Sequence, residues 1–170
     1  MSSLKKDFVC NDSTKEYYFN GSTSKYNITI DSPNNTVVVH LENATIDMLA
    51  DKEGNSKEKP AILITKNTTA KIYVEGTNVL EGGNNTGLIN KNGYAGIQVE
   101  EGATVTILGN GKVTVKGGGS DHGAAGIGAK YDKNCGKIII GDKNNCPTVI
   151  ATGGDGGAGI GGAEDASCKQ

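Results

Sequence analysis

A short segment of the Ala-Gly-Ile type recurs along the chain, and this recurrence constrains the fold more than any other feature. Its four copies begin at Ala61, Ala95, Ala125 and Ala158, at spacings of 34, 30 and 33 residues. Two further β-type runs follow each of the first three copies, and Gly, Asn and Asp separate the runs. Repeats of this length with three short strands each are typical of a solenoid.

The repeat predicts an all-β fold, a parallel three-sheet β-helix with about 30–34 residues per coil. Successive side chains along each run point to opposite sides of the strand, so we expect Ile97 to face the core in one sheet. In the next sheet we expect Val105 and Ile107 to lie over Ile72 and Val74. The general rule for parallel crossovers predicts a right-handed coil.

The domain organisation follows from where this pattern begins. Residues 1–25 lack the pattern and are expected to cap the N-terminal edge, and 26–170 form a single β-solenoid domain with regular coils from about residue 59. The chain has 26 Gly but only 2 Phe and no Trp, which fits a narrow aliphatic core. A net charge of −2 argues against nucleic acid as a partner. The chain carries no apolar run of about 18 residues, so membrane insertion is not expected.

Three segments carry a resemblance to a known family: Tyr94-Ala-Gly-Ile-Gln-Val99, Gly102-Ala-Thr-Val-Thr-Ile107, and Thr152 to Gly162 with its Ala-Gly-Ile-Gly motif. Over about residues 59–163 the chain resembles the β-solenoid repeats of microbial surface proteins, some of which are labelled carbohydrate-binding or adhesin-like. The resemblance implies a non-catalytic module that is extracellular or at the cell surface. Its partner would be a glycan or another ligand on a host or cell surface.

Sugar rings stack on aromatic side chains and hydrogen-bond to Asn and Asp, which indicates a set of candidate residues. The glycan-binding candidates are Tyr73, Tyr94, Tyr131, Asp121 and Asp155. The two aspartates precede successive repeat segments, so their carboxylates are expected to stack, where Ca²⁺ would relieve their repulsion. Calcium is therefore a possible ligand there, and no other cofactor is expected.

An enzyme is the more distant alternative, because parallel β-helices also host pectin-degrading enzymes. The hydrolases of that type resemble one another in paired Asp, Gly-His-Gly and Arg-x-Lys elements. Here Asp121-His122-Gly123 is the one partial match to these sequence elements, and the chain contains no Arg. We therefore predict no catalytic residues, with a polysaccharide lyase or hydrolase as the residual possibility.

Glycine alternates with the inward-facing residues of the repeat segment. The positions concerned are Gly96, Gly126, Gly128, Gly159 and Gly161. A strip without side chains would let a flat sugar or another backbone approach closely. The competing interpretation, which we favour, is that glycine relieves crowding at tight corners.

Acceptor sites for N-glycosylation are more frequent than the composition predicts, which favours a secreted protein. They begin at Asn11, Asn20, Asn27, Asn34, Asn43, Asn67 and Asn84. A codon bias toward Asn and Lys is the alternative explanation, since all 17 basic residues are Lys.

Four cysteines are candidates for disulfide formation: Cys10, Cys135, Cys146 and Cys168. Cys135 and Cys146 bracket a short run and are expected to close a small loop. Cys10 and Cys168 lie near opposite ends, so an elongated fold leaves them free or bonded between molecules. The latter option leads to a second functional hypothesis, a structural subunit whose copies stack end to end into fibres.

Overall fold

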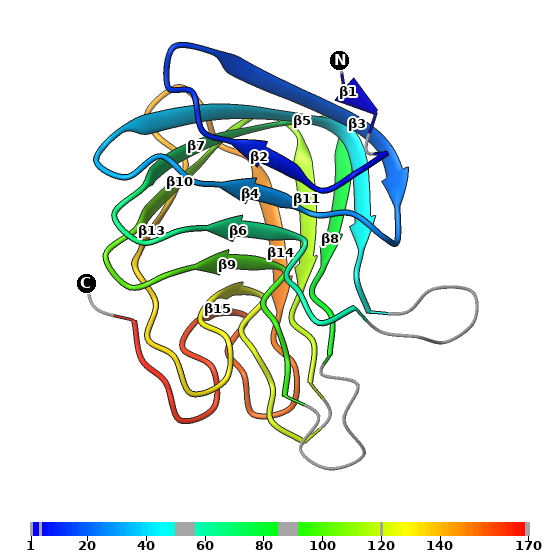
Figure 1. Ribbon diagram of the computed structural model, residues 1–170, viewed down its shortest axis with the longest axis vertical. Coiled ribbons are helices and arrows are strands. Elements are labelled where there is room, and N and C mark those ends of the chain that lie inside the picture. Colours follow the sequence, from blue (N-terminus) through cyan, green and yellow to red (C-terminus); the bar gives the residue numbers. More distant parts are fainter. Residues whose placement is uncertain (1, 4, 50–56, 85–91, 120, 169–170) are drawn as a thin grey trace.

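The computed structural model describes residues 2–3, 5–49, 57–84, 92–119 and 121–168. Across these residues the chain is a parallel β-solenoid of about four turns, formed by strands without a helix (Figure 1). Its strands are β1 (Ser2–Ser3), β2 (Phe8–Cys10), β3 (Glu16–Thr23), β4 (Ile28–Ile30), β5 (Thr36–Asp47), β6 (Ile62–Ile64), β7 (Thr69–Glu75), β8 (Thr77–Glu81), β9 (Ile97–Val99), β10 (Thr104–Gly109), β11 (Lys112–Lys116), β12 (Ile127–Gly128), β13 (Lys137–Ile140), β14 (Thr148–Thr152) and β15 (Ile160–Gly161). The prediction of an all-β parallel solenoid is confirmed.

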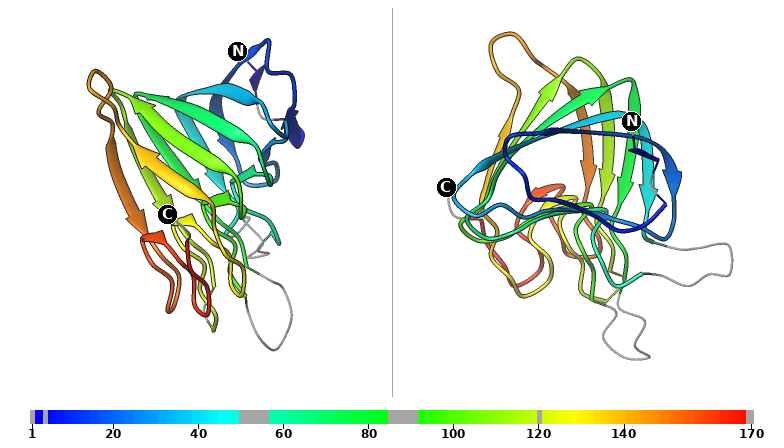
Figure 2. Two further views of the ribbon diagram at one scale, coloured as in Figure 1. Left: turned by 90° about the vertical axis from the view of Figure 1, so that its left-hand side faces the viewer. Right: turned by 45° about the horizontal axis from the view of Figure 1, so that its top comes forward.

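The strands form three faces around one core, and two of these faces are joined (Figure 2). One face is a six-stranded sheet in the order β15-β12-β9-β6-β4-β2. The other two merge into a nine-stranded sheet because β5 pairs with β7 along its first part and with β8 along its last. Asn43 makes the bend within β5 in a left-handed conformation, with φ at 53°. Its side-chain oxygen accepts a hydrogen bond from the Thr77 N–H at 3.0 Å and so ties this corner to the next coil.

The core consists of aliphatic side chains stacked from coil to coil. Ile97 pairs with Ile62 on one side and with Ile127 on the other, and all three are buried. Full burial of such a side chain stabilises a fold by roughly 1.5–3 kcal/mol. Each coil therefore depends on its neighbours for the burial of its apolar residues.

The register of the second face differs from the one predicted. Val105 lies over Ala70, and Ile107 over Ile72, so the predicted stacking on Ile72 and Val74 is wrong by two residues. The inward direction is unchanged, because side chains alternate with a period of two. Gly109 takes the place over Val74, where a Cβ atom would lie only 2.3 Å from the Val74 backbone oxygen.

Four of the five glycines of the repeat segment, all but Gly161, serve close packing at the corners of the coil. A Cβ atom on Gly96 would lie 2.5 Å from Val115 Cγ1 and 2.8 Å from the Leu80 oxygen. On Gly126 it would lie 2.7 Å from the Gly159 oxygen. These positions face neighbouring backbone rather than an open outer strip, which supports the crowding interpretation.

The two ends of the solenoid differ in how they cover the core. At the N-terminal end, β2 and β3 pair in parallel with β4 and β5, so the described part of the expected cap forms a further coil. Phe8 packs edge-on against Phe19 and Tyr17, with centroids 5.1 and 5.8 Å away, and closes the core. At the other end, Ile140 and Ile160 occupy inward positions yet are 39% and 47% exposed. None of the described residues forms a helix that is long and apolar enough to cross a membrane.

Candidate functional site

The candidate site is built by a loop, residues 129–134, that follows β12 and turns back toward the preceding coil. The Ala125 N–H donates to the Ala129 oxygen at 2.9 Å, which reverses the chain directly after β12. The following residues therefore lie against the start of the preceding coil, and Lys130 Nζ comes within 5.2 Å of the centroid of the Tyr94 ring. The repeat in the sequence gives no signal for this reversal, because the reversal does not change the spacing between the repeat segments.

The same reversal recurs one coil later and supports the loop from below. The Ala158 N–H donates to the Gly162 oxygen at 3.0 Å, as Ala125 does to Ala129. Ser167 donates from its N–H and its hydroxyl to Asn134 Oδ1, both at 3.3 Å. The stacked loops share a local backbone conformation, since their aspartates, at 132 and 165, both have φ at 54°.

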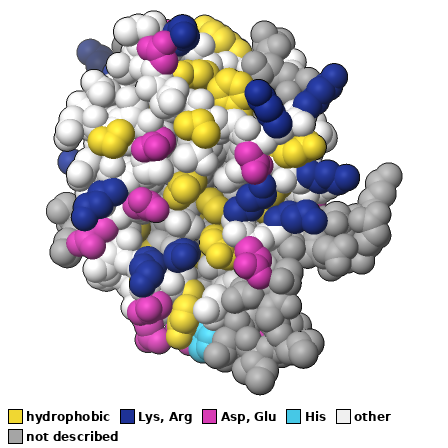
Figure 3. All heavy atoms as spheres, in the orientation of Figure 1, with side chains coloured by type: hydrophobic (Ala, Val, Ile, Leu, Met, Phe, Trp, Pro, Cys, Tyr) yellow, Lys and Arg dark blue, Asp and Glu magenta, His cyan; other side chains and the backbone are white. Residues whose placement is uncertain are grey.

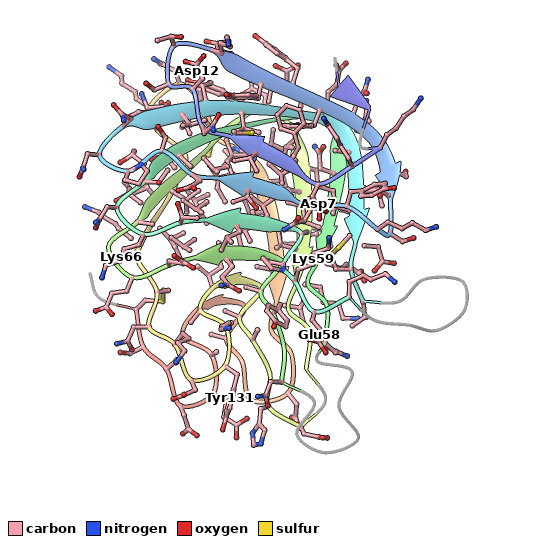
Figure 4. The ribbon with its side chains drawn as sticks, in the orientation of Figure 1. Asp7, Asp12, Glu58, Lys59, Lys66 and Tyr131 are labelled. Atoms are coloured by element: carbon pink, nitrogen blue, oxygen red, sulfur yellow. A yellow bond between two sulfur atoms is a disulfide. The ribbon has the colours of Figure 1, made fainter. Side chains whose placement is uncertain are left out.

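Two cavities flank the loop and together form what we call the groove. The larger, of about 350 Å³, is lined by Lys66, Gln98, Val99, Glu100, Glu101, Ala129, Lys130, Lys133 and Asn134. The smaller, of about 200 Å³, is lined by Asn92, Gly93, Tyr94, Lys130, Tyr131, Asp132 and Lys133. Lys130 and Lys133 line both cavities, so the two are neighbours. Figure 4 shows Lys66 at the side margin of the sheet and Tyr131 below the sheet, marking the two regions of the groove.

The lining of each cavity includes a residue whose side-chain oxygen is buried and has no hydrogen-bond partner in the described structure. These oxygens are Gln98 Oε1 for the larger cavity and Asn92 Oδ1 for the smaller one. Gln98 is only 8% exposed. A buried acceptor without a partner costs about 1–3 kcal/mol, so it is a position where a ligand donor would be bound favourably.

Two of the predicted tyrosines lie in the smaller cavity. Tyr131 stacks on His122 with ring centroids 4.4 Å apart, and His122 Nδ1 lies 3.1 Å from Glu164 Oε2. Burial raises the pKa of Tyr94 and of Tyr131, and nearby acidic groups raise both further. Both hydroxyls therefore remain protonated at neutral pH and can donate hydrogen bonds.

Tyr73, the third predicted tyrosine, lies on a different face. It stacks on His40 at 5.0 Å, and His40 stacks on Tyr18 at 4.3 Å, so the three rings form a ladder across β3, β5 and β7. The Tyr18 hydroxyl donates to Glu16 Oε2 at 2.7 Å, and with His40 this lowers the pKa of Glu16. The ladder covers one face of the Tyr73 ring, and Tyr73 lines neither cavity of the groove.

The predicted aspartates are exposed and do not line the groove. The Asp155 oxygen accepts a hydrogen bond from the Gly123 N–H at 2.6 Å, so Asp155 lies over Gly123. His122, rather than Asp121, pairs with Asn92. Within the described parts of the chain, no group of three or more His, Cys, Asp or Glu side chains is placed to hold a metal ion.

Several of the predicted glycosylation sites have turn roles in the fold. Asn34, Asn43 and Asn67 adopt left-handed conformations with φ between 53° and 64°, which asparagine tolerates better than most residues. Asn84 Oδ1 accepts a hydrogen bond from the Gly119 N–H. Asn27 is only 7% exposed. Asn11 is exposed and Asn20 is half-buried.

The cysteine pairing differs from the one predicted. Cys135 forms a disulfide with Cys168, one coil away, and the predicted loop between Cys135 and Cys146 is not closed. Cys10 is a buried free thiol and Cys146 an exposed one. Of the two options expected for Cys10 and Cys168, Cys10 is a free thiol enclosed in the core, and Cys168 is already bonded within the chain. A coil of about 33 residues brings equivalent positions together, which short-range spacing does not reveal.

Comparison with protein-family models, with curated proteins and with solved structures finds no match for this chain. The function must therefore be argued from the groove itself. Sequence reasoning missed Gln98, His122 and Lys130 as site residues. The available signal was that Gln98 stands where two later repeats have glycine, at Gly128 and Gly161.

Proposed function

We propose that this chain is a non-catalytic carbohydrate-binding module that acts outside the cell or at its surface, and that the groove is its binding site. The observation that carries the proposal is a cavity of about 350 Å³ whose lining includes Gln98, a residue with a buried, unpartnered side-chain oxygen. The cavity has the size of a small-molecule site. An abundance of hydroxyl donors is what distinguishes a saccharide from most other small ligands.

The lining of the groove provides the other contacts that a saccharide needs. Tyr94 and Tyr131 each have one ring face engaged, by Lys130 and by His122 respectively, and both side chains are half-buried, so they can offer aromatic surface to a sugar. Lysine ammonium groups and the tyrosine hydroxyls supply donors for sugar oxygens. Charged side chains of both signs are interspersed over this face of the molecule, without an extended patch of one sign (Figure 3).

The extracellular setting is supported by two independent features. The sequons are more frequent than the composition predicts, and Cys135 is joined to Cys168 in a disulfide, a bond that persists in oxidising compartments. The chain has no Arg and no paired Asp motif of the pectin-degrading hydrolases, so the proposal includes no chemical step.

A glycan array probed with the purified chain tests the proposal. We expect binding to a subset of saccharides, and we expect Gln98→Met to lose it. Asn110→Leu is the matched control, because Asn110 lies at the turn between β10 and β11 and lines neither cavity of the groove. A chain that binds no saccharide on the array, or a Gln98→Met variant that binds as the parent does, would contradict the proposal.

A second candidate function, end-to-end assembly, is favoured by the exposed core at the C-terminal coil. Ile140 and Ile160 present apolar surface beside the free edges of β13 and β15. Exposed edges of this kind pair readily with another strand. Light scattering of the parent chain and of Ile140→Asp with Ile160→Asp tests it, since assembly through this end requires particles that shrink in the double variant. Particles of monomer size for both proteins would rule out this function.

A further inference from the structure

The coil at the C-terminal end of the solenoid leaves one cross-section of the core uncovered. Its three strands, β13, β14 and β15, each pair with a single neighbour among the described strands, and β14 is the orange strand at the outer edge of its sheet in Figure 2. Val149 and Ala151 of β14 point into the core but are only partly buried. Their neighbours in the preceding coil, Val113 and Val115, are fully buried. The apolar residues of the last coil therefore stay in contact with water unless another element covers them.

The N-terminal end offers no matching surface among the described residues. There, the inward-facing Cys10 and Phe19 of the outer coil are only 0% and 2% exposed. β1 covers part of the edge of β3, and the pairing of β3 with β5 shifts its register between Phe19 and Gly21. An irregularity of this kind deters a sheet edge from pairing with another chain. The surface that matches the uncovered end is therefore the same end of a second copy.

The edge strand β14 differs in charge from the strand on which it stacks. β11 begins with Lys112 and ends with Lys116, and the residues in register with them in β14 are Thr148 and Thr152. β14 thus carries no charged side chain along its whole length. Natural edge strands are commonly protected against pairing by charges, and by lysine above all. β14 lacks this protection at the very positions where the strand beside it has lysine.

The free hydrogen-bonding groups of β14 belong to Val149 and Ala151. The Thr148 N–H donates to the Gly111 oxygen at 2.9 Å, so the backbone groups of Thr148 face the preceding coil. In a parallel sheet, successive residues of a strand direct their N–H and C=O groups to opposite sides. The N–H and C=O groups of Val149 and Ala151 therefore lie at the free edge.

The sequence of β14, Thr-Val-Ile-Ala-Thr, matches an antiparallel copy of itself. With Ile150 at a two-fold axis, Thr148 lies opposite Thr152 of the second copy, and Val149 lies opposite Ala151. The free groups of Val149 and Ala151 then bond across the axis, and the two Ile150 residues face each other as a pair without hydrogen bonds. Threonine and β-branched pairs across antiparallel strands are favourable, whereas like charges at these positions would repel.

From these observations we infer that two copies of this chain join through their C-terminal coils into a closed dimer, in which β14 pairs antiparallel with β14 of the second copy. The inference deepens the end-to-end assembly considered above and rests on it, and it is independent of carbohydrate binding. Each copy covers the exposed core of the other. Because both uncovered ends are used in one contact, the assembly stops at two copies and does not extend into a fibre.

Sedimentation of the purified chain over a range of concentrations tests the dimer. We expect a mass that rises to twice that of one chain and no further. Ile150→Lys places like charges opposite each other at the axis and should raise the dissociation constant at least about tenfold. Val9→Lys is the matched control, because Val9 is 50% exposed on the edge strand β2 at the other end, and it should leave the mass unchanged. The melting temperature of each variant verifies that the fold is retained.

A disulfide between copies tests the orientation. Residues of an antiparallel pair without hydrogen bonds have their Cα atoms about 4.5 Å apart, which a disulfide can bridge. Ile150→Cys, made together with Cys146→Ser to remove the exposed thiol, should therefore form a covalent dimer on oxidation. Thr114→Cys in the same background lies at the same register one coil further in and should remain a single chain.

The outcomes separate this inference from end-to-end assembly as such. A mass that keeps rising beyond two chains would overturn the closed dimer and leave end-to-end assembly intact. Loss of the dimer in Val9→Lys would likewise show that the N-terminal end takes part. A dimer that tolerates Ile150→Lys and gives no disulfide with Ile150→Cys would overturn the pairing of β14. The mass of one chain at every concentration would overturn both proposals.

Discussion

Gln98 in β9 pairs in register with Gly128 in β12, so that no side chain lies beside the Gln98 amide in the next coil. In a regular solenoid, an outward residue is flanked by the side chains of its neighbours above and below. Here the neighbour below is glycine, and loop 129–134 covers the space instead. The amide is thereby enclosed and its oxygen left without a partner.

The first prediction concerns the stability of a Gln98→Met variant. Methionine has a similar length and brings no polar atom into the buried space, so the variant should be more stable by about 1 kcal/mol. Denaturant unfolding measures this difference. A structural role for the amide would instead give a less stable variant, so the sign of the change distinguishes a residue kept for binding from one kept for folding.

The second prediction separates the three tyrosines by their effect on saccharide binding. Tyr94→Ala and Tyr131→Ala should each lower the affinity by about 1 kcal/mol, because each removes a ring from the groove. Tyr73→Ala, which removes a ring from the ladder with His40, should leave the affinity unchanged and is the matched control. Equal losses in all three variants would show that the groove is not the site.

The third prediction concerns the disulfide between Cys135 and Cys168. Reduction, or Cys168→Ser, should lower the free energy of unfolding by about 2–4 kcal/mol, because the bond closes a loop of 33 residues. Amide hydrogen exchange should accelerate in residues 129–134, which rest on the segment that Cys168 anchors. Cys146→Ser removes an exposed free thiol and should change neither measurement. Unaltered exchange in the loop after reduction would show that the loop is held without the disulfide.

The fourth prediction concerns Cys10, whose pKa burial raises to about 12. Below the ordinary thiol pKa both the folded and the unfolded chain keep the proton, and this group adds no pH dependence. Above it the unfolded chain releases the proton while the folded chain keeps it, so stability falls as the pH rises toward 12. Part of the loss between pH 9 and 12 should therefore disappear in Cys10→Ala.

Labelling with iodoacetamide at pH 8 provides a second measurement on the same residue. Cys146 is exposed and should react in the folded chain, whereas Cys10 should react only in denaturant. Peptide mass spectrometry distinguishes the two positions. Rapid labelling of Cys10 in the native chain would contradict its burial.

The solenoid itself could be predicted from the sequence because its signal is periodic. Ala95, Ile97 and their counterparts fix which residues face inward, and each later copy repeats the information. The register did not follow with the same certainty, as Ile107 over Ile72 shows. A shift of two residues keeps every side chain on its face, so alternation alone cannot exclude it.

The groove could be predicted only in part. Tyr94 and Tyr131 were identified by residue type, but their proximity depends on the hydrogen bond between Ala125 and Ala129 that reverses the chain. That bond joins two small residues whose types carry no turn signal. The sequence marks Gln98 only as the residue that stands where Gly128 and Gly161 follow in later repeats, and its burial beside the reversed loop becomes visible only in three dimensions.

The continuous strand β5 also has a mechanical consequence. Its first part is hydrogen-bonded to β7 and its last part to β8, so two faces of the solenoid share one strand at the N-terminal end. Toward the other end, β13, β14 and β15 are separate short strands at the edge of their sheets. A pulling force along the axis stretches the hydrogen bonds between coils, so it would detach the latter coils in small steps, whereas detachment at β5 must break the bonds of two faces together. The coil that contains β5 should therefore resist detachment under an axial force better than the later coils, which include those that carry the groove.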